Sequence, residues 1–282
     1  MMVGFYTPDV IVNDAKRHGL EIWPPHVNYS DVKCTVAGPA TIRLGLAYVD
    51  GLGAASIHQI LVARNERLFQ ALPDFCQRTR LPRRLVESLI KGGAMADWVP
   101  PRELLWALGR TNYREELALI WPDEPVSLPT LLEAEQLAWE YEALGLTTGQ
   151  QVMALYRADL QARGACSSQQ LRHGRDGTQV TTAGLVVVRQ RPPTARGPVS
   201  ATHRSDAHDP PDIYPHNCYL FISLEDEEGL IDLILSPVVA WQYIPQLRAS
   251  LLVVTGYLQK SDGVVNIMVQ QVFPLQDWLR VS

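Results

Sequence analysis

The pattern of apolar and polar residues changes character along the chain. Up to residue 144, apolar side chains recur at intervals of three and four positions, which is typical of amphipathic helices. From Val180 onward they alternate with polar side chains, which is typical of strands with one buried face. Helices are expected at 8–18, around 57–61, after Pro82 and at 130–144, and a short strand is expected at 20–23.

Local signals mark several helix ends. Gly19 and Gly145 each follow the last apolar position of a helix, where glycine commonly closes the final turn. Thr130 and Glu133 have the spacing of a capping box, so the helix at 130–144 is expected to begin at this pair.

A glycine-rich turn precedes the helix around 57–61. Gly51 and Gly53 let the backbone approach a phosphate closely, and the following helix presents free N–H groups and the positive end of its dipole. This has the form of a helix-hairpin-helix that binds DNA. Arg43, Arg64 and Arg67 are close in sequence and are expected to add positive charge. The alternative is a tight turn between two packed helices, because two glycines so spaced are a weak signal.

The second half of the chain predicts five strands. They are expected at 180–191, 218–225, 230–235, 251–259 and 264–272. A helix from Pro237 through Leu247 falls between the third strand and the fourth, which is the order of an OB-fold barrel. The predicted fold class is therefore α+β, with a helical helix-hairpin-helix region followed by a five-stranded OB-fold β-barrel.

One face of this barrel is expected to bind a single strand. Alternation on the second strand sends Leu220, Ile222 and Leu224 toward the core and leaves the neighbouring aromatic residues outside, where bases stack on OB-folds. The expected face comprises Tyr219, Phe221, Arg189, Arg191 and Arg196. The alternative is that these aromatic side chains pack against the helical region or against the long loop at 198–217.

Composition and charge refine this picture. With 282 residues, 46% of them hydrophobic and 20% charged, the chain is long enough for two or three folded domains. The predicted division is 1–40, 41–110 (helix-hairpin-helix), 111–179 (helical connector) and 180–282 (OB-fold). The net charge of −5 hides two basic islands, at 41–95 and 157–204, and an acidic stretch between them. Basic islands are the usual electrostatic mark of nucleic-acid binding.

Candidates for catalysis and metal binding are weak. Cys34, Cys76, Cys166 and Cys218 are far apart, which suggests free thiols in a reducing cytoplasm. The acidic run at 226–228 falls on a hairpin turn and is expected to be solvated. Three histidines and two aspartates of the long loop match no metal-ligand spacing; they are His203, His208, His216, Asp206 and Asp209. No catalytic residue and no metal ligand is therefore expected, nor any membrane segment, since no apolar run approaches about 20 residues.

Several strings resemble the C-family DNA polymerase III α subunit of bacteria, and in particular its error-prone branch. In order along the chain they are GFYTP (4–8), DAKRHG (14–19), RLGL (43–46), GLG (51–53), LIKGGA (89–94), YEALGL (141–146), GLVVVRQRPPTARG (184–197) and LEDE (224–227). The resemblance implies tandem helix-hairpin-helix motifs against duplex DNA, an OB domain near the template strand, and a role in translesion synthesis. It also implies that 1–40 is the remnant of a fingers region.

The resemblance carries further expectations about partners and chemistry. Family partners would include the sliding clamp and an inactive Y-family-like accessory protein. The family's chemistry uses Mg²⁺ and palm-domain aspartates upstream of the matching strings, so this chain is expected to hold no cofactor of its own and not to polymerise alone. Two departures from the family are Gln150–Gln151–Val152, where a His-Pro pair is usual, and the insertion at 198–217.

Three functions follow as hypotheses. The first is a DNA-binding portion of an error-prone polymerase, encoded as a truncated or split gene product. The second is an independent adaptor that binds single strands through the barrel alone. The third is a subunit that docks through 1–40 on a separately encoded catalytic polypeptide.

Overall fold

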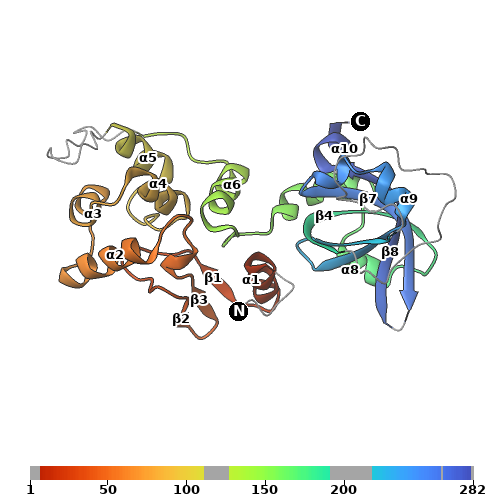
Figure 1. Cartoon of the computed structure of the whole chain (residues 1–282), viewed down its shortest axis with the longest axis horizontal. Coiled ribbons are helices and arrows are strands. Elements are labelled where there is room, and N and C mark those ends of the chain that lie inside the picture. Colours follow the sequence, from red (N-terminus) through yellow and green to blue (C-terminus); the bar gives the residue numbers. More distant parts are fainter. Residues whose placement is uncertain (1–6, 111–126, 191–217, 262, 281–282) are drawn as a thin grey trace, which may run out of the picture. The chain divides into compact units, whose positions relative to one another are not determined.

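The computed structural model (Figure 1) describes residues 7–110, 127–190, 218–261 and 263–280. The chain divides into two compact units, which we name the hairpin unit (Ile11–Gln150) and the barrel unit (Met1–Val10 with Gln151–Ser282). The division lies inside the range 111–179 that the sequence suggested as a connector. The finer subdivision of the chain stays a prediction.

The hairpin unit combines helices with one small sheet. Its elements are α1 (Pro8–Arg17, which crosses the division), β1 (Glu21–Trp23), β2 (Thr35–Gly38), β3 (Thr41–Arg43), the 3₁₀ turn η1 (Leu46–Tyr48), α2 (Ala54–Glu66), α3 (Leu72–Thr79), α4 (Arg83–Lys91), α5 (Pro101–Arg110) and α6 (Glu133–Leu144). The sheet order is β1-β3-β2, with β1 parallel and β2 antiparallel to β3. Apolar side chains of α2, α3 and α4 form one core with Leu44 and Leu46, so the segment leading into the hairpin is fixed by burial.

Two of the three expected helix-end signals are confirmed. Gly19 and Gly145 adopt positive φ angles of 84° and 68°, the left-handed conformation that glycine tolerates best. The expected capping box is wrong, because α6 begins at Glu133 and its N-cap is Leu132. The Glu135 carboxylate accepts the Leu132 N–H at 2.9 Å and is held by Arg102, which sets the start of α6 later in the chain.

The barrel unit is a closed five-stranded barrel with short helices around it. Its elements are η2 (Val152–Tyr156), α7 (Arg157–Ala162), α8 (Ser168–His173), β4 (Gln179–Gln190), β5 (Leu220–Glu225), β6 (Leu230–Leu235), α9 (Pro237–Gln242), η3 (Gln246–Arg248), β7 (Leu251–Ser261), β8 (Val264–Pro274) and α10 (Leu275–Arg280). The strand order is β4-β5-β6-β8-β7, and β6 with β8 is the parallel pair. The predicted five strands, with a helix between the third and the fourth, are confirmed.

The expected helix from Pro237 through Leu247 is two shorter pieces. Pro245 separates α9 from η3. A proline lacks the N–H that a continuing helix requires, and it disfavours helical geometry at the residue before it. Inside the barrel, Leu220, Ile222 and Leu224 are each no more than 1% exposed, so the predicted inward face of β5 is confirmed.

The acidic turn at 226–228 differs from the expectation of a solvated turn. Asp226 is fully buried and accepts hydrogen bonds from the backbone N–H and the hydroxyl of Ser168, at 2.7 and 2.6 Å. Its other donors are the backbone N–H groups of Glu228 and Gly229, both at 2.9 Å. Arg157 balances the charge at 3.2 Å. Asp226 is therefore a buried connection between the barrel and the helices α7 and α8, while Glu228 of the same turn is exposed as expected.

Removing this charge is expected to destabilise the barrel unit. Burial alone would lower the pKa of Arg157, but Glu227 and Asp226 together raise it above its ordinary value. Asp226→Asn removes the charge that balances Arg157 and replaces one acceptor oxygen by an amide NH2 that faces other donors, so the free energy of unfolding should fall by about 2–3 kcal/mol. Urea denaturation measures the loss. Asp232→Asn is the control, because Asp232 is exposed and, among the described residues, accepts a hydrogen bond only from Ser223. Equal losses in the two variants would contradict the account.

In the part of the chain that the structure describes, every helix is too short or too polar to cross a bilayer.

Candidate nucleic-acid interface

The hairpin between η1 and α2 is anchored by two apolar side chains. Val49 and Leu52 are 3% and 6% exposed and belong to the core of the hairpin unit. Asp50 donates its N–H to the carbonyl of Ala143 at 2.7 Å, which fastens the turn to the end of α6. Gly51, at φ +75°, then carries the chain outward in a conformation that favours glycine.

The tip of the hairpin leaves the start of α2 open. Gly53 is exposed and is the N-cap of α2, so no side chain caps the first free N–H groups of the helix. The next two residues, Ala54 and Ala55, are exposed and small. A Cβ at Gly53 would meet no atom within 4 Å. A phosphate oxygen therefore has unobstructed access to backbone donors at the positive end of a 13-residue helix.

Arg84 stands beside the hairpin, and the sequence analysis did not single it out. A Cβ at Gly51 would lie 3.2 Å from a terminal nitrogen of the Arg84 guanidinium. Arg84 is exposed, and among the described residues it makes no hydrogen bond or ion pair. Its place on the exposed side of α4 was visible in the sequence, but nothing there connected α4 to the hairpin.

Arg64 and Arg67 are not brought to the hairpin. Arg64 lies near the far end of α2, about 16 Å from Gly53 by the rise of an α-helix. Its guanidinium donates to the carbonyl of Ser30 at 2.6 Å, and Arg67 pairs with Asp74 at 2.7 Å. Both side chains serve the packing of the hairpin unit in this structure, and a role for them in DNA binding stays a prediction.

Arg43 also has local partners, in the small sheet. Its guanidinium carbon lies 4.8 Å from the ring centre of Trp23 and 5.5 Å from that of Tyr29. Burial lowers the pKa of Arg43 below its ordinary value. The arginine is thus part of an aromatic cluster on β1 and β3.

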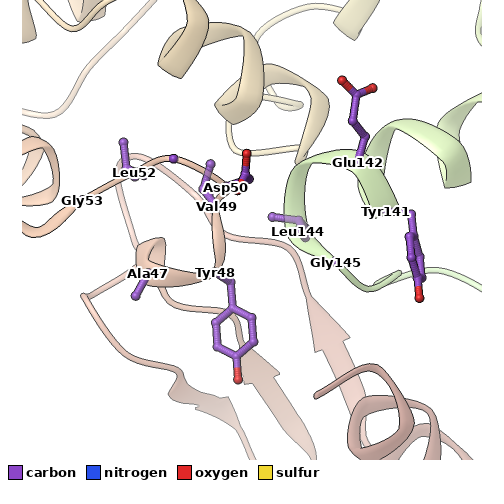
Figure 2. A pocket seen from close by; sticks show the side chains of 11 residues that line it. Ala47, Tyr48, Val49, Asp50, Leu52, Gly53, Tyr141, Glu142, Leu144 and Gly145 are labelled. Atoms are coloured by element: carbon purple, nitrogen blue, oxygen red, sulfur yellow. The ribbon is translucent and has the colours of Figure 1, made fainter. Parts of the chain in front are cut away.

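A pocket of about 590 Å³ lies between the hairpin and α6 (Figure 2). Its lining residues are Ala47, Tyr48, Val49, Asp50, Gly51, Leu52, Gly53, Tyr141, Glu142, Leu144 and Gly145. Leu144 extends from α6 toward the hairpin, and the charged lining side chains, Asp50 and Glu142, are both acidic. Glu142 is neutralised by Lys91 at 2.7 Å. An acidic lining disfavours phosphate, so we place the phosphate contact on the exposed side of the hairpin and not in this pocket.

A histidine under the aromatic cluster makes the hairpin unit sensitive to pH. Nδ1 of His26 accepts the N–H of Asn28 at 3.0 Å, and Nε2 lies 2.9 Å from Asp97. Burial lowers the pKa of His26 below its usual 6.5, although the hydrogen bond to Asp97 opposes the shift. The neutral ring, with its proton on Nε2, satisfies both contacts.

Acid should therefore destabilise the hairpin unit through His26. Above pH 6.5 the ring is neutral in the folded and the unfolded chain, and below it the unfolded chain takes up the proton first. The free energy of unfolding should fall as the pH drops below about 6.5, and His26→Asn, which keeps an acceptor near Asn28, should flatten that part of the curve. Urea titrations of both proteins between pH 5 and 8 measure the difference. Parallel curves would contradict the assignment.

On the barrel, the structure separates the expected arginine from the expected aromatic residues. Phe221 is half-buried on the outer face of β5, and Tyr219 lies just before this strand. Arg189 pairs with the buried Ile222, because a bulge between Val186 and Val188 shifts the register of β4. Its guanidinium instead donates to two carbonyls near η3, both at 3.0 Å. In this structure Arg189 is therefore not on the face of Phe221, and its role in DNA binding stays a prediction, while Arg191 and Arg196 lie outside the described residues.

A row of apolar side chains crosses four strands on that outer face. Strand pairing joins Phe221 to Ile234, Ile234 to Met268 and Met268 to Tyr257. Each of the four is at least partly exposed, and Tyr257 is 41% exposed. The row spans about 14 Å, three strand spacings. Sequence alternation placed Phe221 outward, but the neighbours that complete the row depend on the register between β6 and β8.

A basic segment borders the Tyr257 end of this row. The segment 172–178 runs beside β7, with hydrogen bonds between Leu258 and both Gly177 and Thr178. Lys260 donates to the carbonyl of Arg172 at 2.6 Å. The guanidinium groups of Arg172 and Arg175 are exposed, and within the described residues neither makes a hydrogen bond or ion pair. The Arg172 guanidinium lies beside Gly229, in the turn after Asp226, where a Cβ on Gly229 would come within 3.1 Å of a terminal nitrogen. Arg175 is therefore the exposed arginine that this segment offers near the aromatic end of the row, and positive charge beside aromatic rings is typical of grooves that bind single strands.

In the described ranges, no three His, Cys, Asp or Glu side chains are placed to hold a metal ion. The residues present there do not fit the Mg²⁺ that the resemblance implies for the family.

Comparisons with known proteins agree with this geometry. A family model described as a helix-hairpin-helix motif matches residues 19–105. An error-prone DNA polymerase from Corynebacterium efficiens is 34% identical over 98% of this chain, and one from Pseudomonas savastanoi pv. phaseolicola is 32% identical over 97%. Nearly the whole chain is therefore similar to one part of proteins named error-prone DNA polymerase. It spans only 24% and 26% of the length of these two relatives.

These matches confirm the resemblance drawn from the sequence strings, and the structure confirms a helix-hairpin-helix region followed by a closed barrel. A third error-prone DNA polymerase, from Alkalilimnicola ehrlichii, is 31% identical over 98% of the chain and is matched over 26% of its own length. Among solved structures, an asparaginyl-tRNA synthetase from Pyrococcus horikoshii aligns with 39% of the chain and 22% of its own length, at 13% identity and a TM-score of 0.28. That likeness is too distant to bear on function.

Proposed function

We propose that this chain holds DNA for an error-prone DNA polymerase, without reading its sequence. The hairpin binds the backbone of duplex DNA, and the outer face of the barrel binds the template single strand. The observation that carries the proposal is the open start of α2, where Gly53 leaves backbone donors uncapped beside an Arg84 that has no partner among the described residues.

The hairpin would act through main-chain donors. A phosphodiester oxygen accepts hydrogen bonds from the first N–H groups of α2, and the helix dipole adds to the attraction. Arg84 supplies a full positive charge next to the same phosphate. Contacts of this kind fix the position of the duplex and carry no information about its bases, which suits an enzyme that must accept any template.

The barrel would act through stacking. Bases of a single strand lie on the rings of Phe221 and Tyr257 and on the apolar side chains between them, while Arg175 faces the phosphates. Every base has a flat face, so such a row tolerates any sequence.

The remaining properties come from the family and from its longer members. We assign nucleotide addition, with its Mg²⁺ chemistry, to parts of the relatives beyond the quarter that this chain matches. Translesion synthesis in DNA repair or replication, a sliding clamp and a polymerase accessory protein are proposed on the same ground. A palm-containing polypeptide that co-purifies with the chain would support the docking role of 1–40, and solitary behaviour would count against it.

Removal of one guanidinium tests the hairpin contact. Arg84→Ala should weaken duplex binding about 5- to 10-fold at low salt. It should also reduce the slope of log affinity against log salt by about one, because one phosphate contact is lost. Fluorescence anisotropy with a labelled duplex measures both quantities. Arg83→Ala is the matched control, since Arg83 is the neighbouring arginine and is already paired with Glu87 at 2.8 Å. Equal effects of the two changes would remove Arg84 from the site.

A further inference from the structure

The aromatic cluster of the hairpin unit contains an arginine held between two rings. Trp23 on β1 pairs with Arg43 on β3, in the small sheet labelled in Figure 1. The guanidinium of Arg43 lies over the rings of Trp23 and Tyr29, at 4.8 and 5.5 Å. The two aromatic residues remain 37% and 58% exposed. Large rings this exposed, around a positive charge, form a surface that a flat ligand can reach.

The rings are fixed in place without any ligand. Tyr29 lies on the ring of His26, with the centroids 4.6 Å apart, and His26 is held by Asp97. Arg64 donates to the carbonyl of Ser30, which fastens the loop that carries Tyr29. A surface that is ordered before binding loses less conformational entropy when a ligand arrives.

Arg43 differs from other stacked arginines in how its donors are used. Arg78 and Arg163 also lie over aromatic rings, but each donates to backbone carbonyls, at 2.9 Å or less for Arg78 and at 2.8 and 3.0 Å for Arg163. Among the described residues, nothing accepts a hydrogen bond from Arg43. A guanidinium has five N–H donors in a planar fork that matches phosphate or carboxylate oxygens. The edge of this fork is therefore available to an anion.

We propose that Trp23, Arg43 and Tyr29, which we name the stacked-arginine site, bind a nucleotide. Arg43 takes the phosphate through its free edge, and the exposed rings take the base. The ligand chemistry, a phosphate next to a stacking base, is shared by a nucleic-acid strand and by a free nucleoside triphosphate. The strand would be a third contact added to the proposed DNA binding and rests on that function, whereas the free nucleotide does not.

The partial burial of Arg43 strengthens this site. A guanidinium removed from part of its water attracts an anion more strongly than one in bulk solvent, because the local dielectric is lower. Burial lowers the pKa of Arg43, yet an arginine stays charged at neutral pH. A simple carboxylate could accept hydrogen bonds from the Arg43 guanidinium, but it has no ring to stack on Trp23 and Tyr29, so a nucleotide fits the site better.

Two titrations on the full chain separate the possible sources. One uses a labelled oligothymidylate, followed by anisotropy, and the other uses thymidine triphosphate, followed by calorimetry. Arg43→Gln and Trp23→Leu should each weaken at least one of the two titrations about 10-fold, and Arg43→Lys should weaken it less than Arg43→Gln. Arg110→Gln is the matched control, because Arg110 lies over the single ring of Trp106 at the same 4.8 Å. Thermal unfolding shows that each variant is folded.

Each outcome distinguishes the stacked-arginine site from the proposed DNA binding. If the strand binds but neither probe responds to Arg43→Gln, the stacked-arginine site is wrong and the proposed DNA binding stands. A response with thymidine triphosphate alone assigns the site to free nucleotides, and a response with the strand alone assigns it to DNA. If the cluster instead packs against another protein, both titrations will match those of Arg110→Gln, and the proposal is overturned.

Discussion

Gly53→Leu is expected to lower the affinity of the chain for duplex DNA about 100-fold while leaving its folding intact. Two backbone donors to a charged phosphate contribute at least about 1.5 kcal/mol each, which together corresponds to about 100-fold, and a leucine side chain at the start of α2 blocks the approach to both. The backbone at Gly53 has φ −71° and ψ 168°, which any residue adopts, and an added Cβ meets no neighbour within 4 Å. The change therefore acts on the ligand and not on the fold.

Gly149→Leu is the matched control for this experiment. Gly149 is likewise exposed and in open space, but it lies outside the hairpin. Gly51→Ala would be a poorer test, because Gly51 sits at φ +75° and a side chain there strains the turn itself. Anisotropy with a labelled duplex and thermal unfolding of both variants measure the outcome. Unchanged duplex affinity in folded Gly53→Leu would mean that the barrel acts alone, as in a single-strand adaptor.

The second large effect is expected on the barrel. Base stacking on an aromatic side chain is worth about 1–3 kcal/mol, so Phe221→Ala combined with Tyr257→Ala should weaken single-strand binding by about 30-fold or more. The two residues lie at opposite ends of the row on the outer face and belong to different strands. Neither is in the barrel core, which limits the loss of stability.

Trp241→Ala combined with Val238→Ala is the control for the barrel experiment. Both residues are exposed apolar side chains of α9, 38% and 69% exposed, and neither belongs to the row. Anisotropy with a labelled oligonucleotide compares the two double variants. A loss of affinity of similar size in both would show that any exposed apolar side chain suffices, which would contradict a specific stacking row.

The architecture was predictable because hydrophobic periodicity decides it. The alternation around Ile222 and the position of Pro237 are enough to order five strands and a helix into a barrel. Gly51 likewise marked the hairpin, since its positive φ favours glycine, while Gly53 marked the exposed start of α2 in a conformation that any residue adopts. These signals are local in the sequence and need no knowledge of distant contacts.

The charged groups were harder to place, because their partners are distant in sequence. A single bulge in β4 turns Arg189 away from the expected face, because a shift of one residue in the strand register reverses the direction of every side chain after the bulge. Asp226 appeared to be a turn acid, but it is buried by residues from α7 and α8. Arg84 meets the hairpin from another helix. In each case the two residues in contact are at least 30 positions apart in the sequence.

The dependence of DNA affinity on salt tests the central claim most directly. In this account, the chain binds phosphates through the hairpin and the basic segment 172–178. Log affinity for a primer–template junction should then fall linearly with log salt, with a slope of about −3 or steeper. Exchange of the DNA sequence should leave both the affinity and the slope unchanged. A slope near zero, or a strong preference for one sequence, would contradict the account.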